Sequence, residues 1–107
     1  MHIKFIKFDE NEALKAFESD AEGIELKLPE ELSEAVWEKL ALIKEIAHPL
    51  PIIVTYSPSW KRERLEEILT KLAVFYVSGI SLKKNIDARF LSQLIRASHL
   101  GLSLLVK

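Results

Sequence analysis

The chain of 107 residues contains no cysteine. This absence excludes disulfides, thiol nucleophiles, iron–sulfur clusters and cysteine-based zinc sites, and it is compatible with a reducing compartment. Only three glycines are present, and none lies close to another, so both the phosphate-binding P-loop and the dinucleotide fingerprint are missing. The three histidines, at positions 2, 48 and 99, show no metal-ligand spacing. We therefore expect no metal, no cofactor and no catalytic residue.

Long hydrophobic runs are also missing. The longest, residues 72–77, has the length of a strand and is far shorter than the roughly 20 residues that a membrane-spanning helix requires. The first eight residues lack the apolar stretch and cleavage site of a signal peptide. We therefore expect a soluble cytoplasmic protein without a membrane partner. Many lysines, glutamates, isoleucines and leucines beside a single methionine are typical of a thermophilic source.

Length and composition predict one domain over residues 1–107. A chain of this size buries a core without disulfide or metal support. Hydrophobic residues make up 49% of the sequence and supply that core, while the 29% of charged residues cover the surface.

Strand-like and helix-like patterns alternate along the chain. Strands are expected near residues 2–8, 24–28, 52–56, 74–80 and 102–106, with a helix between each pair. This order predicts an α/β fold with a mostly parallel five-stranded sheet and right-handed crossovers. Two arrangements fit: an open flavodoxin-like sheet with the second strand at an edge, and a partial TIM-like barrel with the strands in sequence order. The strict alternation over residues 24–28 indicates one wet face and favours an edge position.

Charge is divided unevenly between the two halves of the chain. Residues 1–56 carry 6 Lys/Arg and 12 Asp/Glu, whereas residues 57–107 carry 9 Lys/Arg and 4 Asp/Glu. In a parallel sheet the loops after the strands meet at one edge, where ligands bind. We therefore expect that edge to be acidic over the first two strands and basic over the next two. Such segregation steers association with charged partners.

The loop after the third strand carries the sharpest functional signal. Ser57 or Ser59 is expected to cap the following helix, whose first turn then holds cations that oppose the helix dipole. A bound anion would reverse that penalty, and Tyr56 and Trp60 would offer stacking surfaces for RNA bases. The loop after the fourth strand adds further cations. The predicted RNA- or anion-binding residues are Ser57, Ser59, Trp60, Lys61, Arg62, Arg64, Lys83, Lys84 and Arg89.

Each of these residues also has a purely structural interpretation. Arg62 is four residues before Glu66 and Arg64 three before Glu67, which are the spacings of surface ion pairs on a helix. Trp60 could pack over the end of the sheet.

Two aspartates follow strands, where a catalytic or magnesium-binding carboxylate could lie. Asp9 and Asp87 are the residues on which an enzymatic interpretation would depend. Helix capping explains both residues without any chemistry, and Asp9 followed by Glu12 has the spacing of a capping box.

The run Pro51-Ile52-Ile53-Val54-Thr55-Tyr56-Ser57-Pro58, a basic amphipathic helix, and then Val74-Phe75-Tyr76-Val77-Ser78 resembles the barrel-type (α/β) protein subunit of archaeal ribonuclease P. The opening strand–helix–strand unit, residues 2–28, is also similar. The resemblance covers most of this chain but only about the first half of that family's longer barrel. No strict motif is shared. It implies a noncatalytic partner of a catalytic RNA that cleaves precursor tRNA alongside other small protein subunits. A half-length version would need a partner chain to cover its open sheet edges.

Two functions of different classes follow from these observations. The first is an RNA-binding protein of a ribonucleoprotein, whose affinity falls steeply with salt. The second is a protein-interaction module, in which the acidic half of one copy meets the basic half of another in a homo-oligomer.

Overall fold

The computed structural model describes residues 2–84 and 88–107, in which strands and helices alternate. The strands are β1 (Ile3–Ile6), β2 (Gly23–Leu26), β3 (Ile52–Thr55), β4 (Gly79–Leu82) and β5 (Ser103–Val106). The helices are α1 (Glu10–Phe17), α2 (Glu34–Ala47), α3 (Leu65–Val74) and α4 (Arg89–Ala97), with a short 3-10 turn at Arg62–Arg64 before α3.

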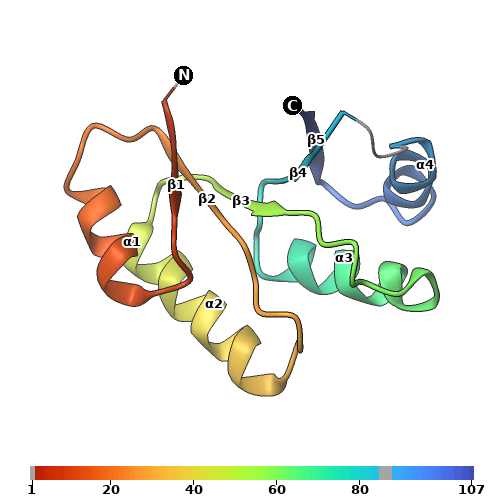
Figure 1. Ribbon diagram of the computed structural model, residues 1–107, viewed down its shortest axis with the longest axis horizontal. Coiled ribbons are helices and arrows are strands. Elements are labelled where there is room, and N and C mark those ends of the chain that lie inside the picture. The colour runs from red at the N-terminus through yellow and green to blue at the C-terminus, as the bar shows by residue number, and fades with distance from the viewer. Residues whose placement is uncertain (1, 85–87) are drawn as a thin grey trace.

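The five strands form one parallel sheet in the order β1-β2-β3-β4-β5. The predicted α/β fold is therefore confirmed, and the strand order is that of the partial barrel. The flavodoxin-like alternative is wrong, because β1 and not β2 occupies the edge. The sheet stays open, and the helices follow one another around its outer side from α1 to α4 (Figure 1). Right-handed crossovers between neighbouring parallel strands place every helix on the same face.

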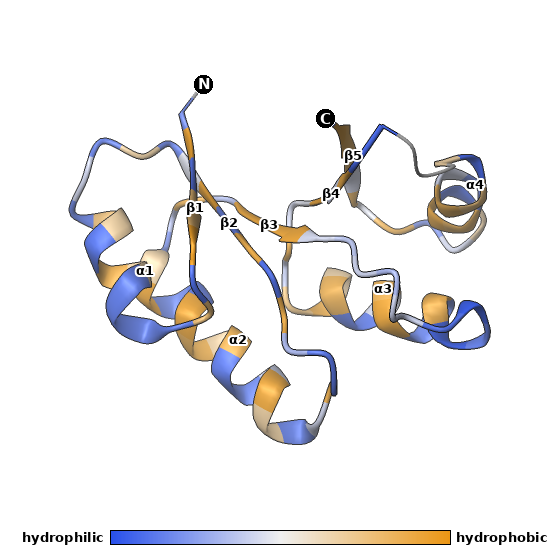
Figure 2. Cartoon of the chain, viewed as in Figure 1, coloured by the Kyte–Doolittle hydropathy of each residue, from blue (hydrophilic) through white to orange (hydrophobic). Residues whose placement is uncertain are grey.

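Alternate strand residues build the core between the sheet and the helices. Ile24, Ile52 and Ile80, on three consecutive strands, are completely buried there. The helices turn their apolar side toward these residues and keep polar residues outward (Figure 2). Among residues 2–84 and 88–107, helices cover one face of the sheet, and the other strand residues point to the opposite face, which we call the uncovered face.

The second strand departs from its sequence-based prediction. All four residues of β2 are buried, and β2 lies between β1 and β3. The polar residue that made β2 look like a solvent-exposed edge strand is Glu25. Its side chain lies on the uncovered face of the sheet but is only 4% exposed. The predicted edge position is wrong because polar partners from distant parts of the chain satisfy this carboxylate.

The fourth strand begins later than the sequence indicates. Residues 74–80 read as a strand because they are apolar, but Val74 ends α3 and β4 begins only at Gly79. Phe75 stacks on Trp37 of α2 with ring centroids 5.7 Å apart, and Tyr76 has a positive φ of 61° that reverses the chain. The apolar run therefore serves helix packing and a turn before the strand starts.

Candidate functional site

Lysines follow four of the five strands directly. Lys7, Lys27, Lys83 and Lys107 each occupy the first position after β1, β2, β4 and β5. Because the strands are parallel, their carboxyl ends share one edge of the sheet, which is where α/β proteins bind ligands. The fold thus gathers cations that are far apart in the sequence.

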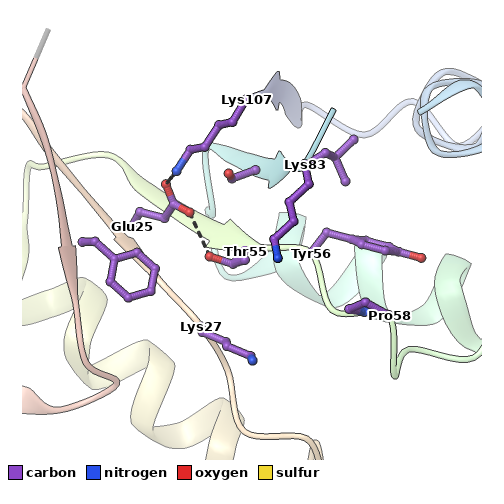
Figure 3. A pocket seen from close by; sticks show the side chains of 10 residues that line it. Glu25, Lys27, Thr55, Tyr56, Pro58, Lys83 and Lys107 are labelled. Atoms are coloured by element: carbon purple, nitrogen blue, oxygen red, sulfur yellow. Dashed lines mark hydrogen bonds and ion pairs between the residues drawn. The ribbon is translucent and has the colours of Figure 1, made fainter. Parts of the chain in front are cut away.

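Three of these lysines line a cleft of about 260 Å³ on the uncovered face of the sheet. We call it the lysine cleft, defined by Lys27, Lys83 and Lys107. Figure 3 shows Lys107 reaching across to Glu25, with Lys83 beside Tyr56. The rings of Phe5 and Tyr56 contribute apolar and aromatic surface to the walls.

The carboxylate of Glu25 is fixed by two donors from other strands. Thr55 Oγ1 on β3 donates a hydrogen bond to Glu25 Oε2 over 2.8 Å. Lys107 Nζ donates to Glu25 Oε1, which joins residues 82 positions apart in the sequence. These contacts tie β2, β3 and the end of β5 together at the floor of the lysine cleft, and charged hydrogen bonds of this kind are the stronger ones in proteins.

Glu25 remains ionised despite its burial. Burial is the largest effect and by itself would raise the pKa of Glu25. The hydrogen bonds from Lys107 and Thr55, the positive charge of Lys107 and a smaller effect of Ser81 together outweigh it. The net result is a pKa below the ordinary value of 4.5. The cleft therefore holds a stable negative charge at neutral pH, and Lys107 neutralises it.

The lysine cleft carries an excess of positive charge. Glu25 is the single acid among the described residues that line it, and Lys107 is already bound to this carboxylate. Lys27 and Lys83 face the same space with no acid of the described lining to balance them. Two ammonium groups beside neutral hydroxyl and aromatic groups form a suitable surface for phosphate oxygens.

Ser57 and Ser59 do not cap a helix, which corrects the prediction. α3 begins at Leu65, well beyond both serines. The serines instead stabilise a turn: their hydroxyl oxygens are 2.7 Å apart, and the Ser59 backbone N–H donates to Ser57 Oγ over 3.2 Å. The Trp60 N–H closes the turn by donating to the Ser57 carbonyl over 3.1 Å. The serine side chains are therefore engaged within the loop.

Trp60 packs in the core and offers no exposed stacking surface. Its side chain is 5% exposed, and its ring meets that of Tyr56 edge-to-face at 5.4 Å between centroids. The indole N–H is buried without a hydrogen-bond partner. The expectation of an aromatic platform at Trp60 is wrong, because the loop turns the ring toward the end of the sheet. Tyr56, which is half-buried, lines the lysine cleft instead.

The arginines of this loop have partners of their own. Arg62 packs over the ring of Phe90 in α4, with its guanidinium carbon 4.0 Å from the ring centroid. Arg64 pairs with Glu67 over 3.2 Å, which confirms the ion pair that their spacing indicates. For Arg62 the expected pairing with Glu66 is replaced by the cation–π contact. That contact brings the loop after β3 against the start of α4.

Cations of the loops after β3 and β4 line different clefts. Lys61 and Arg64 lie in a second cleft of about 360 Å³ together with Glu30 and Glu31 of the loop after β2, whereas Lys83 belongs to the lysine cleft. Acidic and basic loops thus face one another in the second cleft. Lys84 and Arg89 are exposed, and neither is among the residues that line these two clefts.

The two candidate catalytic aspartates have different outcomes. Asp9 caps α1, because its Oδ2 accepts a hydrogen bond from the Glu12 N–H over 3.1 Å. Asp87 lies outside the described residues. Within residues 2–84 and 88–107, no group of three or more histidine, aspartate or glutamate side chains is arranged to hold a metal ion.

Sequence reasoning missed Glu25, Lys27 and Lys107. Of the three lysines that line the lysine cleft, Lys83 is the one that was among the predicted binding residues. A signal was available, because a lysine directly after each of several parallel strands predicts a cluster of cations at one sheet edge.

No family model matches the chain, and no curated protein matches it. Across the part of the chain that the structure describes, every helix is too short or too polar to cross a membrane.

Proposed function

We propose that this protein is a noncatalytic RNA-binding protein that contacts RNA phosphates at the lysine cleft. The observation that carries the proposal is the convergence of Lys27 and Lys83 on a cleft whose single described acid is already neutralised by Lys107. Phosphate contacts made by lysines supply most of the affinity of such proteins and little sequence specificity.

The surroundings of the lysine cleft favour a polynucleotide over an isolated inorganic anion. Tyr56 presents an aromatic ring beside Lys83, and base stacking on such rings contributes about 1–3 kcal/mol per base. Lys84, which follows Lys83 in the sequence, is also exposed. A strand of RNA could therefore place one phosphate between the lysines and its next base on the ring of Tyr56.

The resemblance to the ribonuclease P subunit suggests which RNA to test first. Within this proposal the protein acts in a cytoplasmic ribonucleoprotein that processes precursor tRNA, where the RNA component performs the cleavage. The absence of cysteine fits that compartment.

Fluorescence anisotropy with labelled precursor tRNA and with a single-stranded RNA tests the proposal across a salt series. We expect binding at low salt, with the logarithm of the affinity falling linearly as the logarithm of salt rises. The double variant Lys27→Gln/Lys83→Gln should weaken binding of both RNAs. It should also lower the salt slope by roughly 0.7 to 0.9 per phosphate contact removed.

A matched double variant controls for net charge. Lys15→Gln/Lys44→Gln removes the same charge from α1 and α2, which lie on the opposite face of the sheet. We expect it to bind RNA nearly as well as the wild type. Absence of RNA binding at low salt, or an equal loss in both double variants, would contradict the proposal.

A further inference from the structure

Within the part of the chain that the structure describes, both edges of the sheet lack a neighbouring strand. Among the described residues, β1 pairs only with β2, and β5 pairs only with β4. An uncapped parallel edge exposes backbone N–H and C=O groups that can pair with another strand. The hydrogen bonds that β5 makes to its neighbour show which of its backbone N–H groups remain available at the edge. The N–H of Ser103 donates to the carbonyl of Ser78, just before β4, and the N–H of Lys107 donates to the carbonyl of Leu82 in β4. The alternate N–H groups of Leu104 and Val106 therefore point outward.

The surface beside β1 is acidic and partly apolar. Residues 9–22, which contain α1, carry six acidic residues and a single lysine. Leu14 and Phe17 of α1 remain 46% and 44% exposed, and Phe5 of β1 is 62% exposed. Exposed apolar surface of this kind beside an edge strand is typical of a surface that binds another protein.

The surface beside β5 is complementary to it. Residues 88–107 contain no acid, and beside Lys107, which is already paired with Glu25, they carry Arg89 and Arg96. A groove of about 210 Å³ runs between α4 and β5, lined by Ile95, Leu102 and Leu104 with Arg96 at its side. Val106 of β5 is 56% exposed. The β5 edge therefore has an apolar groove beside the positive charge of Arg96. The β1 edge instead has exposed apolar side chains beside acidic residues.

We propose that two copies of this chain join through these edges, with β1 of each copy pairing in parallel with β5 of the other. A twofold axis along the strand direction keeps all strands parallel and forms both junctions at once. The strand order then runs from β1 to β5 of one copy and on through β1 to β5 of the second. The result is a closed ring of ten parallel strands with no free edge.

Charge and topology favour a second copy over an unrelated partner. α1 and α4 lie at opposite ends of the sheet, as Figure 1 shows, so each junction would be flanked by Glu18 and Asp20, which follow α1 in one copy, and by Arg96 of α4 in the other. Opposite charges across a junction steer the association and fix its register. Closure also turns the uncovered face inward, where the exposed ring of Phe5 and the half-buried Leu105 would be shielded from water.

Sedimentation equilibrium of the full chain over a concentration series tests this assembly. We expect a species of twice the 12.3 kDa chain mass and none larger. Val106→Pro removes an outward N–H from β5 without touching its bonds to β4, and it should raise the dimer dissociation constant roughly 10- to 100-fold. The control Val106→Ala keeps that N–H and should dissociate less readily than the proline variant.

A charge exchange tests the same junction independently of any folding defect in the proline variant. Arg96→Glu should weaken the dimer, and adding Glu18→Lys should restore part of the lost affinity, because the exchanged charges attract again across the junction. Salt should reduce the difference between these variants.

Several results would overturn the assembly. They are a wild-type monomer at every concentration, species larger than two chains, and an equal effect of Val106→Pro and Val106→Ala. A dimer insensitive to both the proline and the charge variants would also place the interface elsewhere. RNA binding is measured separately: the lysine cleft is complete within one chain, and because its lysines follow the carboxyl ends of the strands it would lie at one open end of the ring.

Discussion

Replacing Lys107 with methionine isolates the energetic role of the Glu25–Lys107 pair. The substitution keeps an apolar stem of similar length but leaves Glu25 ionised in a buried position with Thr55 as its remaining close donor. A hydrogen bond to a charged group contributes about 1.5–3 kcal/mol. Because the Lys107 side chain is 59% exposed, solvent screens part of that contribution. We expect the free energy of unfolding at neutral pH to fall by about 1–2 kcal/mol.

The stability lost on replacing Lys107 should depend on pH, being largest at neutral pH and smaller in acid. In the wild type the pKa of Glu25 is lowered below 4.5, so its stabilising effect is complete above pH 4.5 and disappears as the pH falls through the folded-state pKa. Without Lys107, the largest effect that lowers the pKa of Glu25 is lost, and burial then raises this pKa. Protonation then relieves the buried charge in the variant, so the two proteins should approach equal stability in acid.

Urea unfolding followed by circular dichroism at about pH 7 and about pH 3 measures both quantities. Lys15→Met provides the control, since Lys15 is 73% exposed and lies 3.8 Å from Glu12 in a surface ion pair. We expect the control to cost less than about 1 kcal/mol at either pH. The reasoning would be refuted if Lys107→Met were harmless at neutral pH, or if its cost were the same at both pH values.

Two further predictions concern the N-terminal cap of α1 and the contact between β4 and β5. Asp9→Ala removes the side-chain acceptor for the Glu12 N–H and should lower the free energy of unfolding by about 1 kcal/mol, measured by urea titration; no change would show that this cap contributes nothing. Gly79→Ala would bring a methyl group within 2.8 Å of the Ser103 carbonyl oxygen and should lower the melting temperature by displacing β5 from β4. Gly101→Ala, with open space around the new methyl group, is the matched control, and equal melting of the two variants would contradict the packing argument.

The alternation of elements was predictable because it depends on local patterns. Buried β-branched runs such as residues 52–55 and the capping pair Asp9–Glu12 identify their elements within a few residues of sequence. Strand order was left open between two arrangements, because hydrophobic patterns constrain which face of a strand is buried but not which strand lies beside it. The hydrogen bonds between neighbouring strands decide that question.

The candidate site could be predicted only in part, for physical reasons. The burial of Glu25 depends on Lys107, 82 residues away, and no local pattern reveals such a contact. Trp60 is adjacent to basic residues and therefore resembles a binding residue, yet its large apolar ring is buried against Tyr56. Lys83 was found because it follows a strand, and the same rule applied to every strand would also have found Lys27.

Amide chemical shifts of the isotope-labelled protein during titration with a short single-stranded RNA test the central claim most directly. We predict that the largest changes fall on Lys27, Thr55, Lys83 and their neighbours around the lysine cleft, and that added salt reverses them. Shifts confined to α1 and α2 on the opposite side of the sheet, or no shifts at low salt, would contradict the assignment of this cleft as an RNA-phosphate site.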